Sequence, residues 1–290
     1  MAALGGIEGA ETLATLGERS QPLAEFSSGS TKKRRHFRWW RLVVLSLAAV
    51  YFLGPLYAGI KFSLEDIQGG YSFHAIQSIP SAPGFSAAFW LSMRITIVTV
   101  VVSALLMIPT AIYVHLRVPQ MRRVLDFVTV LPIVIPPIVL IVGVLDASPI
   151  WVKSSPYLLS FMYVILAMPF VYRSLDAGLG AVDLKTLTEA SRSLGGNWIK
   201  TLWRVVLPNL RSALMSALVL ALALALGEFT MASLDLWTTI PVWIYQFQNA
   251  SNGHVQIAAA MVGLVGAIVL VTIIVSLDRS QSWRRKMSAK

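Results

Sequence analysis

Six apolar runs, separated by polar or charged segments, constrain the fold of this chain more than any other feature. They cover residues 42–60, 87–114, 124–145, 157–172, 213–234 and 255–277. A helix needs roughly 20 apolar residues to cross a hydrocarbon core of about 30 Å, so each run is long enough, or nearly so, to span a membrane. The composition agrees, because 56% of the residues are hydrophobic and only 13% are charged. The sequence predicts an all-α integral membrane protein with six transmembrane helices.

Basic residues are distributed very unevenly between the segments that join these runs. If the first helix enters from the cytoplasm, 21 of the 24 Lys and Arg residues fall in cytoplasmic segments, and the exceptions are Lys61, Lys153 and Arg94. This asymmetry follows the positive-inside rule. We therefore expect a multi-pass protein of a bacterial-type plasma (inner) membrane with both termini in the cytoplasm. The basic residues that give the chain its net charge of +10 are explained by this membrane orientation. We therefore predict no nucleic-acid partner.

Several classes of chemistry find no support in the sequence. There is no cysteine, and four scattered histidines make no spaced metal cluster. Neither a phosphate-binding loop nor a dinucleotide-binding glycine pattern occurs. We predict no catalytic residue, no metal site and no cofactor in this chain, so that any ATP is handled by another subunit.

Two ionisable residues fall inside predicted spans. Arg94 and Glu228 each lie about 10 Å from the outer end of a helix, estimated from the rise of a helix per residue. Charges at such depth are costly and need a partner or a function. We hypothesise that the two residues pair or face each other across an outward-facing cavity, and we treat both as candidates for the translocation pathway. The alternatives are that Arg94 reaches to the interface and that Glu228 makes a hydrogen bond between helices.

Other polar and aromatic residues receive structural interpretations. Asp126 is expected to complement the dipole at the start of the third helix. The prolines within the spans predict bent, packed helices, and this reading is preferred to a role in gating. The outer segment 235–254 is rich in aromatic residues, for which anchoring at the interface is preferred to contact with a partner. These are Trp237, Trp243, Tyr245 and Phe247.

The segment 173–212 between the fourth and fifth spans is the long cytoplasmic loop. Leucines and isoleucines recur in it at helical spacings, and Gly195-Gly196-Asn197 interrupts them. This pattern predicts two short amphipathic helices joined by a sharp bend. We expect Thr188 to cap the first of them and Pro208 to force a second change of direction before the fifth span.

The same loop carries a spaced motif. It reads Glu189-Ala190-Ser191, three residues, Gly195, nine residues, Val205, one residue, Leu207-Pro208. This spacing resembles the EAA loop of ABC importer permeases, whose pattern is Glu-Ala-Ala, three residues, Gly, nine residues, Ile, one residue, Leu-Pro. Ser191 and Val205 depart from the pattern, and both changes are small in volume.

The resemblance implies the fold of a type I ABC importer transmembrane domain with a cytoplasmic coupling loop. It divides the chain into a cytoplasmic tail (1–40), a first transmembrane helix (41–62), the permease core (85–280) and a C-terminal tail (281–290). The motif residues would form the coupling contact with a cytoplasmic ABC ATPase dimer, in which ATP and Mg²⁺ are bound. Further implied partners are a second permease subunit, with a heterodimer favoured over a homodimer, and an extracytoplasmic substrate-binding protein. The chain itself would not be an enzyme.

The sequence indicates the substrate less clearly than it indicates the family. Leu194 and Gly227-Glu228-Phe229 are similar to permeases of the polyamine, iron, molybdate or thiamine type. A polyamine such as spermidine or putrescine is the first choice, and thiamine, iron, phosphonate, oxyanions and sugars are the others. A competing hypothesis is a secondary transporter driven by an ion gradient, in which Arg94 and Glu228 would be the coupling pair. A membrane scaffold without transport is a third.

Overall fold

The computed structural model describes residues 39–65, 70–250 and 253–287. The chain divides into two units, Met1–Val50 and Tyr51–Lys290. The described part of the first unit is the beginning of helix α2 (Trp39–Leu64). The second unit contains the end of α2 and all of the later helices. Within the described residues, the one β-type pairing is an isolated bridge between Glu65 and Tyr71.

Five segments of the described chain are long and apolar enough to cross a membrane, or six if one strongly bent pair counts as a single span. Each overlaps one of the predicted apolar runs, and the predicted all-α membrane fold is confirmed. The five are α2, α4 (Phe85–Arg117), α8 (Tyr157–Gly180), α12 (Arg211–Gly227) with α13 (Thr230–Leu234), and α15 (Gly253–Met287).

The bent pair covers the third predicted span, 124–145, and the bend expected from its prolines is a complete break between two helices. A short turn, η1 (Pro119–Met121), leads into α5 (Arg122–Val134), and α6 (Pro137–Ala147) follows at an angle of 93° to it. Ile135 and Pro136 between them have extended ψ angles of 120° and 135°. The proline ring disfavours the helical region for the residue before it, and here two prolines follow one another. The helix therefore stops and restarts.

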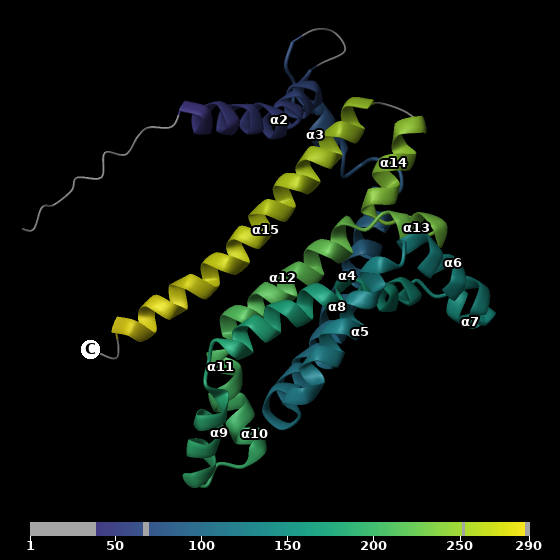
Figure 1. The fold of residues 1–290 in the computed structure, drawn as a ribbon. Coiled ribbons are helices and arrows are strands. Elements are labelled where there is room, and N and C mark those ends of the chain that lie inside the picture. Colours follow the sequence, from purple (N-terminus) through teal and green to yellow (C-terminus); the bar gives the residue numbers. More distant parts are fainter. Residues whose placement is uncertain (1–38, 66–69, 251–252, 288–290) are drawn as a thin grey trace, which may run out of the picture. The chain divides into compact units, whose positions relative to one another are not determined.

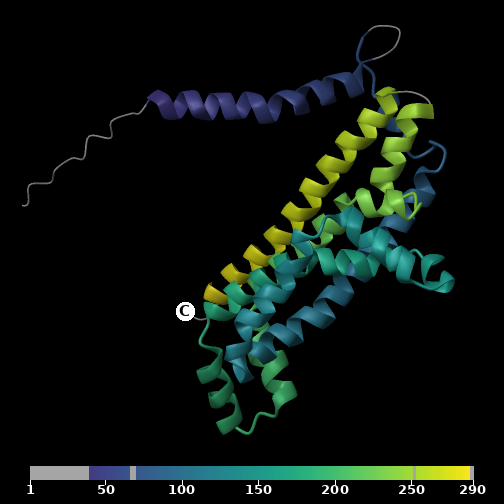
Figure 2. The same ribbon diagram turned by 45° about the vertical axis from the view of Figure 1, so that its right-hand side comes forward.

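Helix α8 lies at the centre of the packed bundle, with α4, α5 and α12 against it (Figures 1 and 2). Leu159, Tyr163 and Leu175 of α8 are fully buried. Small residues let α12 approach closely, since Ala217, Ala221 and Ala225 recur every four residues on its buried face. A Cβ on Gly178 of α8 would collide with Ala213 of α12. The core thus depends on small residues where these two helices meet.

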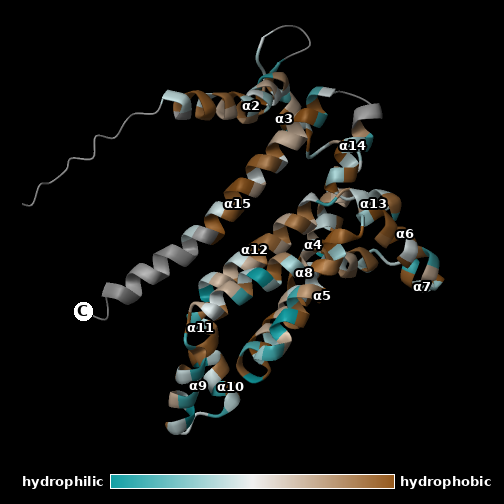
Figure 3. Cartoon of the chain, viewed as in Figure 1, coloured by the Kyte–Doolittle hydropathy of each residue, from teal (hydrophilic) through white to brown (hydrophobic). Residues whose placement is uncertain are grey.

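Much of the apolar surface is left uncovered. Only 11% of the most apolar part of α15 is buried, compared with 61% for α8. Figure 3 shows that the described side chains of α15 are mostly hydrophobic. A helix that is apolar on all sides and little buried is suited to a lipid environment or to further subunits, and not to water.

Short helices lie at the two ends of the bundle. The loop helices α9 (Leu184–Ser193), α10 (Trp198–Thr201), η2 (Leu202–Val206) and α11 (Leu207–Asn209) form what we call the loop end (Figure 1). Helices α3 (His74–Ser78) and α14 (Ile240–Ala250) lie at the opposite end, and α7 (Ile150–Lys153) connects α6 to α8.

The aromatic segment at the opposite end is helical and packs inward, in part against expectation. Trp243 of α14 is only 4% exposed, and its indole Nε1 donates a hydrogen bond of 2.8 Å to the carbonyl of Pro83. Its ring also contacts the rings of Phe85 and Phe247. Trp243 is therefore a packing residue and not an interfacial anchor, whereas Tyr245 is exposed as an anchor requires.

Candidate functional site

The first loop helix, α9, begins at a capping residue that the sequence analysis had misplaced. Asp183 is the N-cap, because its Oδ1 accepts a hydrogen bond of 3.2 Å from the Thr186 amide and its Oδ2 one of 2.7 Å from the Thr186 hydroxyl. These bonds lower the pKa of Asp183. Thr188, which was predicted to be the cap, is buried within α9, and its hydroxyl donates to the carbonyl of Lys185.

Helix α9 ends at a tight bend formed by two glycines. Gly195 has a φ of +79°, which an L side chain adopts only with strain. The Gly195 amide donates to the Arg192 carbonyl at 3.0 Å, and the Gly196 amide donates to the Ser191 carbonyl at 2.9 Å. This pair of bonds is the Schellman motif. A Cβ on Gly196 would lie 2.6 Å from the Ser191 carbonyl oxygen, so both glycines are needed for the turn.

The chain leaves the bend in α10, which is fastened to α9. The side chain of Asn197 caps α10 by accepting a hydrogen bond of 2.8 Å from the Lys200 amide. The hydroxyl oxygens of Ser191 and Thr201 are 2.9 Å apart and share a hydrogen bond. Ser191 is a motif residue where the family pattern has alanine, so the one polar departure from the pattern has a structural use.

The end of the motif connects the loop to the bundle. In η2 the Leu207 amide donates to the Leu202 carbonyl five residues earlier, as in a π-helix. Pro208 has no amide hydrogen to donate, so the regular α-helical pattern cannot continue through it. Val205, Leu207 and Pro208 are half-buried. Leu207 packs against the buried core that includes Val206.

The beginning of the motif faces outward. Glu189 and Ala190 are exposed, and no ion pair is formed by Glu189 within the described part of the chain. Leu194 at the bend is 88% exposed, and Ile199 and Trp203 are exposed as well. The loop is therefore a hydrogen-bonded element that presents a carboxylate and several apolar side chains. Such a surface suits contact with another protein.

The other predicted site residues, Arg94 and Glu228, are not joined in an ion pair. Helix α12 stops at Gly227, and Glu228 in extended conformation precedes α13. The Glu228 carboxylate accepts hydrogen bonds from the Met231 amide, at 3.0 Å to each oxygen, and from the Ala232 amide at 3.4 Å. Arg94 on α4 is exposed. Glu228 thus satisfies the free amides of a restarted helix, which is a structural role within a broken span.

Two ion pairs near the loop end were missed by the sequence analysis. Arg122 of α5 donates from Nη2 and Nε to one oxygen of Asp176 on α8, at 2.7 and 3.1 Å. About one turn away on each helix, Arg173 of α8 lies 3.8 Å from Asp126 of α5. Asp126 is not in the first turn of α5, so its predicted pairing with the helix dipole is replaced by this contact. The sequence did contain a sign of these ion pairs, because residues of opposite charge lie near the cytoplasmic ends of the third and fourth predicted spans, which are consecutive in the chain.

No group of three or more His, Cys, Asp or Glu side chains among the described residues could hold a metal ion. Three buried polar atoms close to α13 have no hydrogen-bond partner in the described part of the chain. They are the Thr239 hydroxyl, the Trp237 Nε1 and one oxygen of Asp235.

Comparison with known proteins adds to this geometry. The sequence model of a family described as "Binding-protein-dependent transport system inner membrane component" matches residues 84–285. The chain is 30% identical over 165 residues to the ferric transport system permease protein FbpB of Actinobacillus pleuropneumoniae. That alignment covers 55% of this chain and 23% of the relative.

Two further relatives are named for the transport of other substrates. A putative 2-aminoethylphosphonate transport system permease protein, PhnV of Salmonella choleraesuis, is 29% identical over 168 residues, or 56% of this chain and 62% of its own length. The sulfate transport system permease protein CysW of Synechococcus elongatus is 31% identical over 117 residues, or 38% and 40%. The chain therefore spans less than two thirds of the length of these relatives.

Proposed function

Since this chain belongs to the family of inner membrane components of binding-protein-dependent transport systems, we propose that it is the permease subunit of an ATP-driven ABC importer. It would form half of the transmembrane path for a small solute. The observation that carries the proposal is the loop of residues 184–209, in which the spaced motif coincides with a hydrogen-bonded, outward-facing helical element.

The partners follow from the same premise. A cytoplasmic ATPase dimer binds and hydrolyses ATP with Mg²⁺ and receives the loop, a second permease subunit completes the path, and a binding protein delivers the solute from outside. The large uncovered apolar surface of α15 supports a further subunit in the membrane. We place both termini and the loop end in the cytoplasm, because 21 of the 24 basic residues then lie there.

ATP hydrolysis in the ATPase would be coupled to the transmembrane helices through a movement of α9 and α10 as one unit. The exposed edge of α9, with Glu189 and Leu194, contacts the ATPase. The Schellman turn and the Ser191–Thr201 hydrogen bond hold α9 and α10 in one geometry, so a displacement of α9 is passed on without being absorbed in the bend. Leu207 and the buried Val206 then transmit it to the core formed by α8 and α12.

For the substrate, we place ferric iron or an oxyanion such as phosphonate, sulfate or molybdate ahead of the polyamine expected from the sequence. The three relatives described above are named for ferric, 2-aminoethylphosphonate and sulfate transport, and a further relative, from Haloferax volcanii, is named as a probable molybdenum ABC transporter permease protein. In addition, the carboxylate that could have attracted a polyamine, that of Glu228, is occupied by backbone amides. The hydrogen bonds of Glu228 to these amides also argue against a role in ion coupling in a secondary transporter.

The test is purification of the tagged full chain from its native membrane, with mass spectrometry of the proteins that accompany it. The wild type should recover an ATPase and a binding protein. Gly195→Trp should lose the ATPase, because a side chain at positive φ distorts the bend. Gly180→Trp is the matched control, since Gly180 is also exposed with no atom near its Cβ position.

Absence of an ATPase under conditions that preserve weak complexes would overturn the proposal. Uptake that survives ATP depletion but stops when the ion gradient is dissipated would support a secondary transporter instead. Once the binding protein is recovered, its ligand preference among ferric iron, the three oxyanions and a polyamine identifies the substrate.

A further inference from the structure

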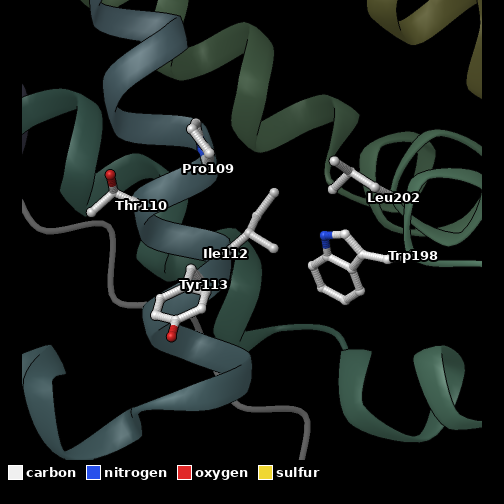
Figure 4. Close-up of a pocket in the computed structure, with 6 residues that line it drawn as sticks. All are labelled: Pro109, Thr110, Ile112, Tyr113, Trp198 and Leu202. Atoms are coloured by element: carbon white, nitrogen blue, oxygen red, sulfur yellow. The ribbon is translucent and has the colours of Figure 1, made fainter.

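A cavity of about 400 Å³ lies at the loop end, between α4 and the loop helices. Figure 4 shows Pro109, Thr110, Ile112 and Tyr113 of α4 on one side and Trp198 and Leu202 on the other. Its volume falls within the range of about 300–1,000 Å³ that is typical of small-molecule sites. Glu189 of the motif and Leu194 at the bend, which we assign to the ATPase contact, do not line it.

The side of the cavity formed by α4 has few free polar groups. Pro109 lies inside this helix and has no amide hydrogen, so it cannot complete the regular bond to the carbonyl four residues earlier. The hydroxyl of Thr110 donates to the Leu106 carbonyl at 2.6 Å instead of projecting into the recess. The wall formed by α4 is consequently apolar in character, and Trp198 provides a flat aromatic wall opposite it.

One basic residue stands beside this apolar recess without a carboxylate partner. The guanidinium of Arg117, the last residue of α4, lies 6.0 Å from the centre of the Trp198 ring. Arg122 and Arg173 nearby are paired with Asp176 and Asp126. In the described part of the chain, no acceptor is found for the Arg117 guanidinium. Its N–H donors remain open to an anion, because stacking on an aromatic face leaves the edge of the guanidinium free.

The position along α4 indicates where the recess lies in a bilayer. A helix of 33 residues is about 50 Å long, whereas the hydrocarbon core is about 30 Å thick. The last turns of α4, with Tyr113 and Arg117, therefore reach the headgroup region. Tyr, Trp and Arg are the residue types that are enriched or tolerated there.

We propose that this cavity binds an anionic phospholipid, with acyl-chain carbons in the recess and the headgroup phosphate on Arg117. The phosphate supplies the negative charge that Arg117 lacks, and Arg is well suited to phosphate because its donors can bind two oxygens at once. The lipid would touch both a spanning helix and α10, and would thereby help to hold the loop against the bundle. This site is independent of the proposed import function, because it needs no ATPase.

The experiment uses the full chain in vesicles and the quenching of tryptophan fluorescence by brominated lipid. The chain has nine tryptophans, so the signal of Trp198 is obtained as the difference between the wild type and Trp198→Phe. Brominated phosphatidylglycerol is compared with brominated phosphatidylcholine, each diluted in unlabelled phosphatidylcholine. We expect quenching of the Trp198 fluorescence to reach its maximum at a low fraction of brominated phosphatidylglycerol. With brominated phosphatidylcholine, quenching should increase only in proportion to the fraction of brominated lipid.

Two variants separate a site from general attraction to the surface. Arg117→Gln should weaken the apparent affinity for phosphatidylglycerol about tenfold or more, because it removes a direct hydrogen bond between a charged donor and the headgroup phosphate. Arg123→Gln is the control, because Arg123 is an exposed arginine that does not line the cavity. A measurement without variants accompanies these: mass spectrometry of the purified wild type should detect one retained phosphatidylglycerol.

The proposal is overturned if both brominated lipids quench Trp198 equally, if Arg123→Gln weakens binding as much as Arg117→Gln, or if no anionic lipid is retained. Quenching that disappears when the ATPase or a second permease is added would show that a protein occupies the recess, which also contradicts a lipid site. Failure to recover an ATPase in the purification described above would leave these results unchanged, so the two proposals can fail separately.

Discussion

The hydroxyl groups of Ser191 and Thr201 lie 2.9 Å apart and join α9 to α10 across the bend at Gly195 and Gly196. Thr201 is completely buried, so its hydroxyl has no access to water if the partner is removed. The motif position that departs from the family pattern therefore carries a contact that the usual alanine could not make.

Ser191→Ala is expected to lower the free energy of unfolding by about 1–2 kcal/mol, because it leaves the buried Thr201 hydroxyl unsatisfied. Thr201→Val in the same chain should recover part of the loss, since it removes the orphaned group. Chemical unfolding of the purified chain in detergent measures both variants. Equal and additive losses from the two substitutions would show that the hydroxyls do not interact.

The two glycines of the bend should respond differently to alanine. Gly195→Ala meets no neighbouring atom and costs about 1–2 kcal/mol through positive φ alone. Gly196→Ala places its Cβ 2.6 Å from a backbone oxygen and should be more disruptive, since α9 must shift. Stability and the amount of co-purified ATPase are the measurements, with Gly180→Ala as control. A smaller effect at Gly196 than at Gly195 would contradict this account of the turn.

Glu228 should behave as a capping residue. Glu228→Ala removes the acceptor for the Met231 and Ala232 amides and is expected to cost about 1–2 kcal/mol. Glu228→Gln keeps one carbonyl oxygen and should cost less. Unfolding and solute uptake are compared for both. If Glu228→Gln folds as well as the wild type but abolishes uptake, the negative charge acts in transport and capping is not its main role.

The ion pair between Arg122 and Asp176 is expected to contribute more than that between Arg173 and Asp126. The first is short and doubly hydrogen-bonded with side chains about one third exposed, while the second is 3.8 Å long with more than half of each side chain exposed. Double-mutant cycles with Gln and Asn should give a coupling of about 1 kcal/mol for the first pair and less for the second. The reverse order would refute the geometric ranking.

Asp235 gives a prediction for pH. Burial raises its pKa to about 6 from an ordinary value of 3.8, so between these values the folded chain binds a proton more tightly than the unfolded chain does. Its contribution to stability should therefore fall as pH rises from about 4 to about 6 and stay constant above that. Asp235→Asn should remove this pH dependence and raise the unfolding midpoint at pH 7, whereas the exposed Asp146→Asn should not. If the stability of Asp235→Asn depends on pH in the same way as that of the wild type, Asp235 is not the source of the pH dependence.

The spanning helices could be predicted because apolar runs of about twenty residues have few alternatives. The bend at Ile135 and Pro136 could not, because a proline inside a span can either kink a helix or end it, and the outcome depends on what each half packs against. The choice of cap between Asp183 and Thr188 likewise depended on the exact start of α9, which the sequence pattern defines only to within a turn.

The candidate site was predictable to a similar degree. Gly195 stood out because a bend between two helical patterns requires a residue that tolerates positive φ. The pairing of Arg94 with Glu228 rested on depth alone, and depth does not specify the direction of a side chain around its helix. The packing of Trp243 onto Pro83 joins residues 160 positions apart, and no local pattern encodes such a contact.

The right-angled bend between α5 and α6 divides one span into two pieces with different neighbours. Helix α5 is bound to α8 through Arg122 and Arg173, whereas α6 packs on α13, the short helix that Glu228 caps. Helix α8 is continuous from Tyr157 to Gly180, whereas the helix that begins with α5 is interrupted at Ile135. At the end away from the loop, the two segments that follow these interruptions, α6 and α13, pack against each other, so each broken span has the other as a neighbour.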